Sequence, residues 1–545
     1  MTTTASSGGV GRASALLASG TLVSRLLGFA SALVLAAALG QASVGDAFAL
    51  ANQLPNNIYA IIAGGLLSAI LVPQIVRAEK HADGGQQYIN RLVTLGLTVF
   101  LLIAIVATLA GPLLVQLYSN QGTRGLSAEQ VQLANLFAYW CLPQIFFYAV
   151  YSLLGEVLNA RRYFGPFTWA PVINNVVAIG GLAAFIGIYG SYDPSAAASV
   201  WNSSMIALVA GTATLGVAAQ ALFLVFFWKR AGLSFRPDFR WRGVGLGNAG
   251  KAAAWTFAMI CVTQLAGIVQ NQVASTASGE GASYATLRYA WLIFMLPHSI
   301  AAVSIATAYF TRMSANARDR DLDAVRRDLS SSLRSIGLVL VFSAVGLIVL
   351  AYPFSALFAN TFAETAQMAP VLIFYLLGLV QFSTLFVLQR TFYALEDTRT
   401  PFFFTLLQSS LFVIGALAVS TWPTQQIGVG IALVTSIAGT VQMLVAAVIL
   451  NRRLGGIDVR RVLRSYGVYL LAALPAAAAG VALLLALGGT SEGGFAVASK
   501  LTAVLSMAII GGVMGLVYLG VLALLKNPEL RSVTTPVLAR LRRSR

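Results

Sequence analysis

Long apolar runs, separated by short polar or charged breaks, make up almost the whole chain. A helix needs about 20 mostly apolar residues to cross the hydrocarbon of a bilayer. Each run is long enough, and a helix pairs internally the backbone groups that lipid cannot hydrogen-bond. The pattern predicts an all-α integral membrane protein with about fourteen transmembrane helices. They lie near 13–40, 46–77, 91–117, 128–160, 166–190, 200–228, 250–276, 282–312, 333–358, 366–395, 401–421, 426–450, 463–488 and 498–525.

The composition supports a membrane protein. The chain of 545 residues is 58% hydrophobic and only 10% charged, and its mean hydropathy is +0.80. A water-soluble globule of this composition would lack the polar residues that cover a surface. The formal net charge of +17 comes from short basic clusters between apolar runs. Because no basic face of a soluble fold is indicated, nucleic acid is excluded as a partner.

The sequence lacks the motifs of soluble enzymes and metal sites. Cys141 and Cys261 lie inside apolar runs, and His81 and His298 stand apart from other ligand types. This spacing fits neither a disulfide framework nor a metal centre. No phosphate-binding Gly-Lys loop or nucleophile elbow occurs either. The sequence therefore argues against an ATPase or a hydrolase and predicts no cofactor or metal. Its energy source is expected outside the chain or in an ion gradient, with sodium, protons and the membrane potential left open.

The basic residues set the orientation of the predicted helices. Of the 35 Lys and Arg, only Arg124 and Lys500 fall at one set of alternate connections, and only Arg25, Arg288 and Arg390 lie at membrane depth, away from the ends of the predicted helices. All others fall at the opposite connections or in the terminal segments. Because Lys and Arg concentrate on the cytoplasmic side of a membrane, we expect both termini to be cytoplasmic.

Two motifs recur in the second half of the chain and predict its domains. Leu54-Pro55-Asn56-Asn57-Ile58 matches Leu296-Pro297-His298-Ser299-Ile300, and segment 158–166 matches 392–401. The recurrence predicts two parallel, pseudo-symmetric six-helix lobes with the substrate path at their interface. The predicted parts are a cytoplasmic N-terminal segment (1–12), an N-lobe (13–228), a cytoplasmic linker (229–249), a C-lobe (250–450), a final helix pair (463–525) and a basic cytoplasmic tail (526–545).

Three arginines lie at membrane depth, where a charge costs about 3 kcal/mol or more and usually faces a hydrated interior. Arg25 lies half way along its helix, which contains no acid. It is the first candidate for substrate binding, with a structural arginine as the alternative. For Arg288 the alternative is snorkelling to an interface, and for Arg390 it is a structural role or snorkelling. Alignment of the Leu-Pro motifs places Arg288 opposite Asp46, and this pair is a candidate outer gate.

Further polar side chains lie in apolar context. Ser24, Asn52 and Asn56 are candidates to line the cavity with Arg25 and Arg288, although amides in membrane bundles commonly bond helix to helix. Glu156 is a lone acid, so it is a candidate to carry a proton or to balance Arg25. A path lined by arginine and amides suits an anionic substrate, because guanidinium binds phosphate oxygens in pairs.

A set of short motifs spans essentially the whole chain. They are Ser24-Arg25-Leu26-Leu27-Gly28-Phe29, Asp46-Ala47-Phe48, Leu54-Pro55-Asn56, Leu71-Val72-Pro73, Leu158-Asn159-Ala160 with Phe164 and Pro166, Ala170-Pro171 with Asn174, and Phe392-Tyr393-Ala394 with Asp397-Thr398 and Pro401. By these motifs the sequence resembles the MurJ (MviN) lipid II flippases of the multidrug/oligosaccharidyl-lipid/polysaccharide exporter superfamily.

The resemblance implies two lobes around a V-shaped cavity and a final helix pair that forms a groove for a polyprenyl tail. It implies a monomer in the bacterial cytoplasmic membrane that moves lipid II, the undecaprenyl-diphosphate-linked peptidoglycan precursor, from the inner to the outer leaflet by alternating access. It also implies cavity charges at Arg25 and Asp46, and an ion-coupling site that involves Asp397. Lipid II and membrane lipids are the expected partners, and cell-wall synthesis proteins stay open as further ones.

The sequence departs from the family at several cavity positions. Ser31 and Ala32 stand where the family has Arg-Asp, Tyr59 and Ala60 stand where it has Arg-Arg, and Gly64 replaces a Glu. The cavity is therefore expected to be less charged. Two alternatives stay open, namely a drug or polysaccharide-lipid exporter of the same superfamily and a non-transporting membrane scaffold for cell-wall synthesis.

Overall fold

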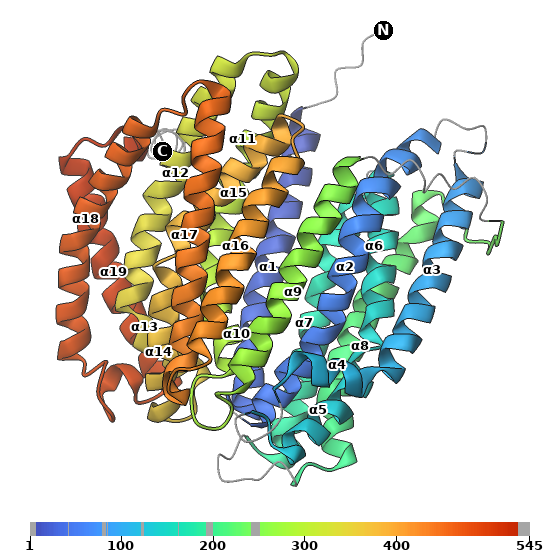
Figure 1. The fold of residues 1–545 in the computed structure, drawn as a ribbon, viewed down its shortest axis with the longest axis horizontal. Coiled ribbons are helices and arrows are strands. Elements are labelled where there is room, and N and C mark those ends of the chain that lie inside the picture. The colour runs from blue at the N-terminus through green and yellow to red at the C-terminus, as the bar shows by residue number, and fades with distance from the viewer. Residues whose placement is uncertain are drawn as a thin grey trace. The chain divides into compact units, whose positions relative to one another are not determined.

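The computed structural model describes residues 7–41, 43–78, 83, 85–120, 125–161, 163–191, 200–240 and 251–531, without the side chains of 7–18, 62–78, 164 and 251–253. Residues 1–6 of the predicted N-terminal segment, 241–249 of the linker and 532–545 of the basic tail lie outside the described residues. Within this range the chain is all-α, as predicted (Figure 1).

Nine α-helices and one 3-10 turn form the described part of the first half. They are α1 (Ser7–Leu39), α2 (Val44–Ala78), α3 (Gln86–Leu109), α4 (Gly111–Tyr118), α5 (Ala128–Cys141), α6 (Gln144–Ala160), α7 (Phe164–Tyr189), α8 (Ser203–Trp228), η2 (Lys229–Ala231) and α9 (Lys251–Ser275).

The second half adds ten α-helices and three short turns. They are α10 (Tyr284–Pro297), the π-helical turn η4 (His298–Ala302), α11 (Val303–Arg318), α12 (Leu322–Val349), α13 (Ala351–Phe358), α14 (Phe362–Leu376), α15 (Leu379–Ala394), α16 (Arg399–Val419), η5 (Thr424–Gln426), α17 (Ile427–Leu454), α18 (Val459–Ala486), η6 (Phe495–Val497) and α19 (Lys500–Leu524).

Every predicted membrane run is helical, but several runs that the pattern predicts as single helices are broken. Run 91–117 divides at Ala110 into α3 and α4, and run 333–358 divides at Leu350 into α12 and α13. In each case a proline follows within a few residues, Pro112 or Pro353. Proline lacks the N–H that would continue the helix.

The breaks recur at matching places in the two halves, which supports the predicted internal repeat. The short helices α4 and α13 each have 8 residues and each follow the third helix of their set. The next run is broken in both sets, after Cys141 between α5 and α6 and after Leu376 between α14 and α15. The α14–α15 pair bends by 42°.

The described helices are long and apolar enough to cross a membrane repeatedly. Twelve of them qualify by length and composition, and thirteen if the bent α14–α15 pair counts as one span. That test covers only the part of the chain that the structure describes, so it does not extend to all residues of α2. The chain is a multi-pass membrane protein.

The chain divides into two compact units, Met1–Gly279 and Glu280–Arg545. Helix α9 packs on α2 within the first unit, and this division falls one helix after the predicted linker 229–249. The assignment of α9 to the C-lobe, which came from the repeat, stays a prediction. Figure 1 shows the first unit from blue to green and the second from green to red.

Each unit is built around its own apolar core. In the first, α3, α6 and α8 meet at residues such as Leu92, Leu153 and Leu224. In the second, one cluster joins α11, α12, α15 and α17. Another joins α12 to the final pair α18 and α19, which lie side by side (Figure 1). The final helix pair therefore packs on the rest of the second unit, chiefly through α12 and α13.

The described part of the predicted linker lies along α3. Gln86, Asn90 and Thr94, one helical turn apart, bond the backbone of the extended segment 234–238. Asp238 then forms ion pairs with Arg91 at 3.1 Å and Arg240 at 2.9 Å. The spacing of four residues puts these α3 side chains on one face. This face of α3 therefore binds the backbone of the linker segment by hydrogen bonds.

Candidate functional site

Arg25 lies within α1, which packs chiefly on α7. Asn175 of α7 donates from Nδ2 to the carbonyl oxygen of Ser24 at 2.9 Å, which fixes this turn of α1. The Arg25 side chain is half-buried, and its Nη1 has no hydrogen-bond partner among the described residues. Among the described residues no ion pair joins Arg25 to Glu156, and the balancing of the two charges stays a prediction. An unpaired guanidinium nitrogen keeps its capacity to bind an anion.

Asp46 lies in the first turn of α2 and is 2% exposed. Its carboxylate accepts a hydrogen bond from the hydroxyl of Ser278 at 2.6 Å, and Gln130 donates to the same hydroxyl at 3.4 Å. Nearby, Ser275 Oγ accepts from the backbone N–H of Asn120 at 2.7 Å. The ends of α2, α5 and α9 are thereby joined by polar contacts, and this is the end of the first unit that the basic residues predict to be outside.

Asn52 and Asn56 have different environments. Asn52 accepts a hydrogen bond from Gln144 of α6 at 3.1 Å, and Gln144 also donates to Thr214 of α8 at 3.0 Å. Asn52 thus bonds helix to helix, which is the usual role of membrane amides. Asn56, one turn further along α2, is exposed and remains a candidate to meet a ligand.

Arg288 lies in α10 of the second unit and is partly buried. Its Nη1, like that of Arg25, has no partner among the described residues. Arg390 is different, because its guanidinium lies 5.2 Å from the ring of Phe310 and 5.0 Å from that of Phe386. Such cation–π contacts stabilise the charge of the Arg390 guanidinium without a bound ligand. The outer gate between Asp46 and Arg288 stays a prediction.

Asp397 lies between α15 and α16, where it caps the start of α16. Its carboxylate accepts from the Thr400 N–H at 2.9 Å and from the Thr400 hydroxyl at 2.7 Å, and it forms an ion pair with Arg453 of α17. Burial opposes ionisation, but these bonds outweigh it and lower the pKa of Asp397 below its ordinary value. Among the described residues no group of three or more metal-ligating side chains occurs. The ion-coupling role of Asp397 stays a prediction.

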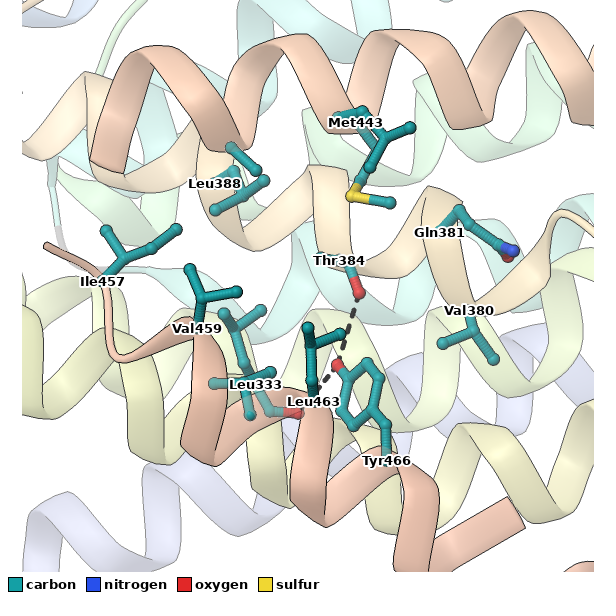
Figure 2. A pocket seen from close by; sticks show the side chains of 13 residues that line it. Leu333, Val380, Gln381, Thr384, Leu388, Met443, Ile457, Val459, Leu463 and Tyr466 are labelled. Carbon is teal, nitrogen blue, oxygen red and sulfur yellow. Dashed lines mark hydrogen bonds between the residues drawn. The ribbon is translucent and has the colours of Figure 1, made fainter. Parts of the chain in front are cut away.

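An apolar pocket of about 330 Å³ lies at the beginning of α18. It is lined by Leu333 of α12, by residues of α15 and α17, and by Leu463 and Tyr466 of α18 (Figure 2). The Tyr466 hydroxyl donates to the Leu333 carbonyl at 3.1 Å and lies 3.3 Å from Thr384 Oγ1. The hydroxyl of Tyr466 is therefore hydrogen-bonded, and its ring lines the pocket.

Two groups of residues were not predicted from the sequence. The pocket draws on α12, α15 and α17 as well as α18, whereas the groove was expected from 463–525 alone. Tyr59 and Ser152 join α2 to α6 by a hydrogen bond between their hydroxyls. A signal for the second group was present, because Gln144, Tyr148, Ser152 and Glu156 recur every four residues, which is the repeat of one helix face.

The fold is that of a known class of transporter. A solved structure of lipid II flippase MurJ in an inward closed conformation matches with a TM-score of 0.68 at 20% identity, over 91% of this chain and 98% of that chain. An inward-facing MATE family multidrug resistance transporter of the MOP superfamily matches with a TM-score of 0.61 at 18% identity, over 79% and 94% of the two chains. The chain therefore shares the fold of these multi-pass membrane proteins.

Sequence comparison narrows the class to one family. The family model "Lipid II flippase MurJ" matches residues 35–508. The probable lipid II flippase MurJ of Rhizobium tropici is 28% identical over 445 residues, 79% of each chain. That of Haemophilus influenzae is 26% identical over 407 residues, 70% of this chain and 75% of its own. The chain belongs to the lipid II flippase MurJ family, so it is a transporter rather than an enzyme.

Proposed function

We propose that this protein moves lipid II from the inner to the outer leaflet of the bacterial cytoplasmic membrane by alternating access. The observation that carries the proposal is the family match over residues 35–508. The half-buried Arg25 with its unpaired Nη1 supports it, because a diphosphate is the anion that a guanidinium binds best. In this proposal Arg25 holds the diphosphate, with Ser24, Asn56 and Arg288 as further cavity residues.

The apolar pocket at the start of α18 is the proposed contact for the polyprenyl tail. Its lining is aliphatic apart from Gln381, Thr384 and Tyr466. An isoprenoid chain gains free energy from such a surface by the packing of its apolar atoms. If the tail stays beside α18 while the headgroup crosses through the protein, the polar headgroup does not enter the hydrocarbon of the bilayer, where it would lose its hydrogen bonds.

The orientation follows from the basic residues. In the second unit, Arg312, Arg334 and Arg453 pair with Asp328, Glu529 and Asp397 near helix ends predicted to be cytoplasmic. We propose that both termini are cytoplasmic and that the protein acts as a monomer, with lipid II and membrane lipids as its partners. Further contacts with cell-wall synthesis proteins would use these same cytoplasmic ends.

Depletion in the host tests the proposed function. Lipid II on the outer leaflet is measured with an externally added reagent in cells rescued by wild type, by Arg25→Ala or by Arg390→Ala. Wild type and Arg390→Ala should restore outer-leaflet lipid II, whereas Arg25→Ala should not, although it should reach the membrane in equal amount. Unchanged outer-leaflet lipid II upon depletion would refute the proposal and favour the exporter or the scaffold.

A further inference from the structure

One face of α6 carries a row of polar side chains through a membrane run. Gln144, Tyr148, Ser152 and Glu156 follow one another at intervals of four residues, so they lie on one face of the helix. Polar groups in a membrane helix are retained where they find partners or line a path. Apolar packing alone therefore does not explain why these four polar side chains lie on one face of α6.

The row is bonded to α2 over most of its length. Gln144 donates to Asn52 of α2 at 3.1 Å, and the Tyr148 hydroxyl donates to Gln144 Oε1 at 3.3 Å. Further along, the Tyr59 hydroxyl of α2 bonds Ser152 Oγ. The ring of Tyr59 also lies 5.7 Å from that of Tyr148. Hydrogen-bonding groups thus continue from Asn52 to Ser152 along the boundary between the two helices.

Glu156 stands at the end of this row, one turn before α6 ends at Ala160. Its carboxyl is partly buried, and within the described part of the chain it makes no hydrogen bond or ion pair. It interacts electrostatically with Tyr59. Because the Tyr59 hydroxyl bonds Ser152, and Ser152 precedes Glu156 by one turn on the same helix face, this hydroxyl lies at the end of the row beside Glu156.

Few other charged groups face α6. Helix α6 packs on α2, α3, α7 and α8. Their titratable residues are Tyr59 at this level, Asp46 at the far end of α2, Tyr88 and Arg91 at the beginning of α3, and Tyr189 at the end of α7. Arg161 follows α6 directly, and the side chain of Arg77 of α2 lies outside the described residues. Among the side chains that the structure describes, the electrostatic partner of Glu156 is the neutral phenol of Tyr59 rather than a cation.

We propose that Glu156 is a proton-binding site whose protonation sets the partner of Tyr59. As a carboxylate, Glu156 accepts the Tyr59 hydroxyl proton in a hydrogen bond, and the Tyr59–Ser152 bond is broken. When the carboxylate takes one proton from hydronium at the near end of α6, it becomes a neutral acid, and Tyr59 returns to Ser152. One O–H bond of hydronium breaks, one carboxyl O–H bond forms and a water molecule is left; release of the proton to water reverses the step.

The switch changes how firmly α2 and α6 are joined. The Tyr59–Ser152 bond links the two helices near the end of α6, whereas the Asn52–Gln144 bond remains in both states. Because α2 also holds α9 through Asp46 and Ser278, loosening one end of α2 is a route by which a proton would bias the transport cycle. This coupling rests on the proposed function, but proton binding itself does not.

Infrared difference spectroscopy of the purified protein in lipid nanodiscs tests proton binding directly. Spectra are taken between pH 5 and pH 9, a range chosen about the neutral point. Wild type should show a protonated-carboxyl C=O band that Glu156→Gln lacks. The matched control Glu129→Gln, an exposed acid at the beginning of α5, should keep it. An unchanged band in Glu156→Gln would overturn the proposal.

Transport in proteoliposomes tests the coupling. If only one protonation state is active, the transport rate of wild type should change about tenfold per pH unit on one side of the titration. The transport rate of Glu156→Gln should not depend on pH. Tyr59→Phe, which keeps the ring and loses the hydroxyl, should also remove the pH dependence of the transport rate. A sodium dependence at constant pH that Glu156→Gln abolishes would overturn the proton assignment. Absence of lipid II transport by wild type at every pH would refute the proposed function instead, while the infrared band still decides proton binding.

Discussion

The carboxylate of Asp46 lies 2.6 Å from the hydroxyl of Ser278 and accepts its hydrogen bond. Asp46 begins α2, and Ser278 follows the end of α9. The contact joins two helices that are far apart in sequence, and it does so with a carboxylate that is 2% exposed. A hydrogen bond to a buried charge is stronger than one between neutral groups.

Ser278→Ala should loosen this end of the first unit. We expect a loss of about 1.5–3 kcal/mol, the range for hydrogen bonds to charged groups, measured by thermal unfolding in detergent. Ser343→Ala is the matched control, because the Ser343 hydroxyl bonds only the carbonyl of Val339 one turn earlier in α12. Equal effects of the two substitutions would show that the Asp46 contact carries no particular stability.

Breaking the ion pair between Arg334 and Glu529 should be more costly. The two side chains are 12% and 8% exposed and join α12 to the segment after α19. Glu529→Gln leaves a buried guanidinium without its counter-charge, so we expect about 3–5 kcal/mol of destabilisation. Removing both charges together in Arg334→Met with Glu529→Leu should cost much less.

An exposed pair provides the comparison for that experiment. Asp323 and Arg326, one turn apart on α12, have side chains 70% and 37% exposed. Asp323→Asn should change stability by less than about 1 kcal/mol, because solvent screens such pairs. If Asp323→Asn destabilised as much as Glu529→Gln, burial would not be the cause.

Acid should release the linker from α3. Hydrogen bonds from Arg240 and Arg91 hold the pKa of Asp238 well below its ordinary value. A carboxylate with a depressed pKa in the folded state stabilises fully above its unfolded pKa, about 3.9, and loses that contribution as the pH falls through the lower folded value. The protection of residues 234–238 from hydrogen exchange, measured relative to the intrinsic exchange rate at each pH, should therefore fall in wild type below about pH 4. In Asp238→Asn the exchange should already be fast at neutral pH, and similar profiles for the two would refute the role of Asp238.

Filling the pocket beside α18 should impair binding of a long-tailed substrate. Ala447 lines the pocket, so Ala447→Phe should weaken binding of a polyprenyl diphosphate at least tenfold, about 1.4 kcal/mol. A diphosphate with a short tail should be unaffected. Val448→Phe is the matched control, since Val448 is the next residue along α17 and is 51% exposed. Equal losses with both substitutions, or an equal loss for the short tail, would move the tail contact elsewhere.

The sequence by itself determined the helical nature of the chain, the positions of its membrane runs and the repeat. These properties are local, because an apolar run of sufficient length is helical in lipid whatever packs beside it. The prolines that follow Ala110 and Leu350 also make the breaks after α3 and α12 readable in retrospect. The motif around Arg25 was sufficient to mark it as the leading candidate for substrate binding.

The tertiary structure decided which polar residues meet. The sequence marked Asp397 as unusual, and the structure gives it Thr400 and Arg453 as partners, of which Arg453 comes from the end of a different helix. The partners of Asp46, Tyr59 and Tyr466 likewise lie on helices distant in sequence. Helix periodicity fixes the face on which a side chain lies, but the neighbour across that face depends on how helices pack. The sequence therefore determined which residues are unusual, and only the packing decided what each of them contacts.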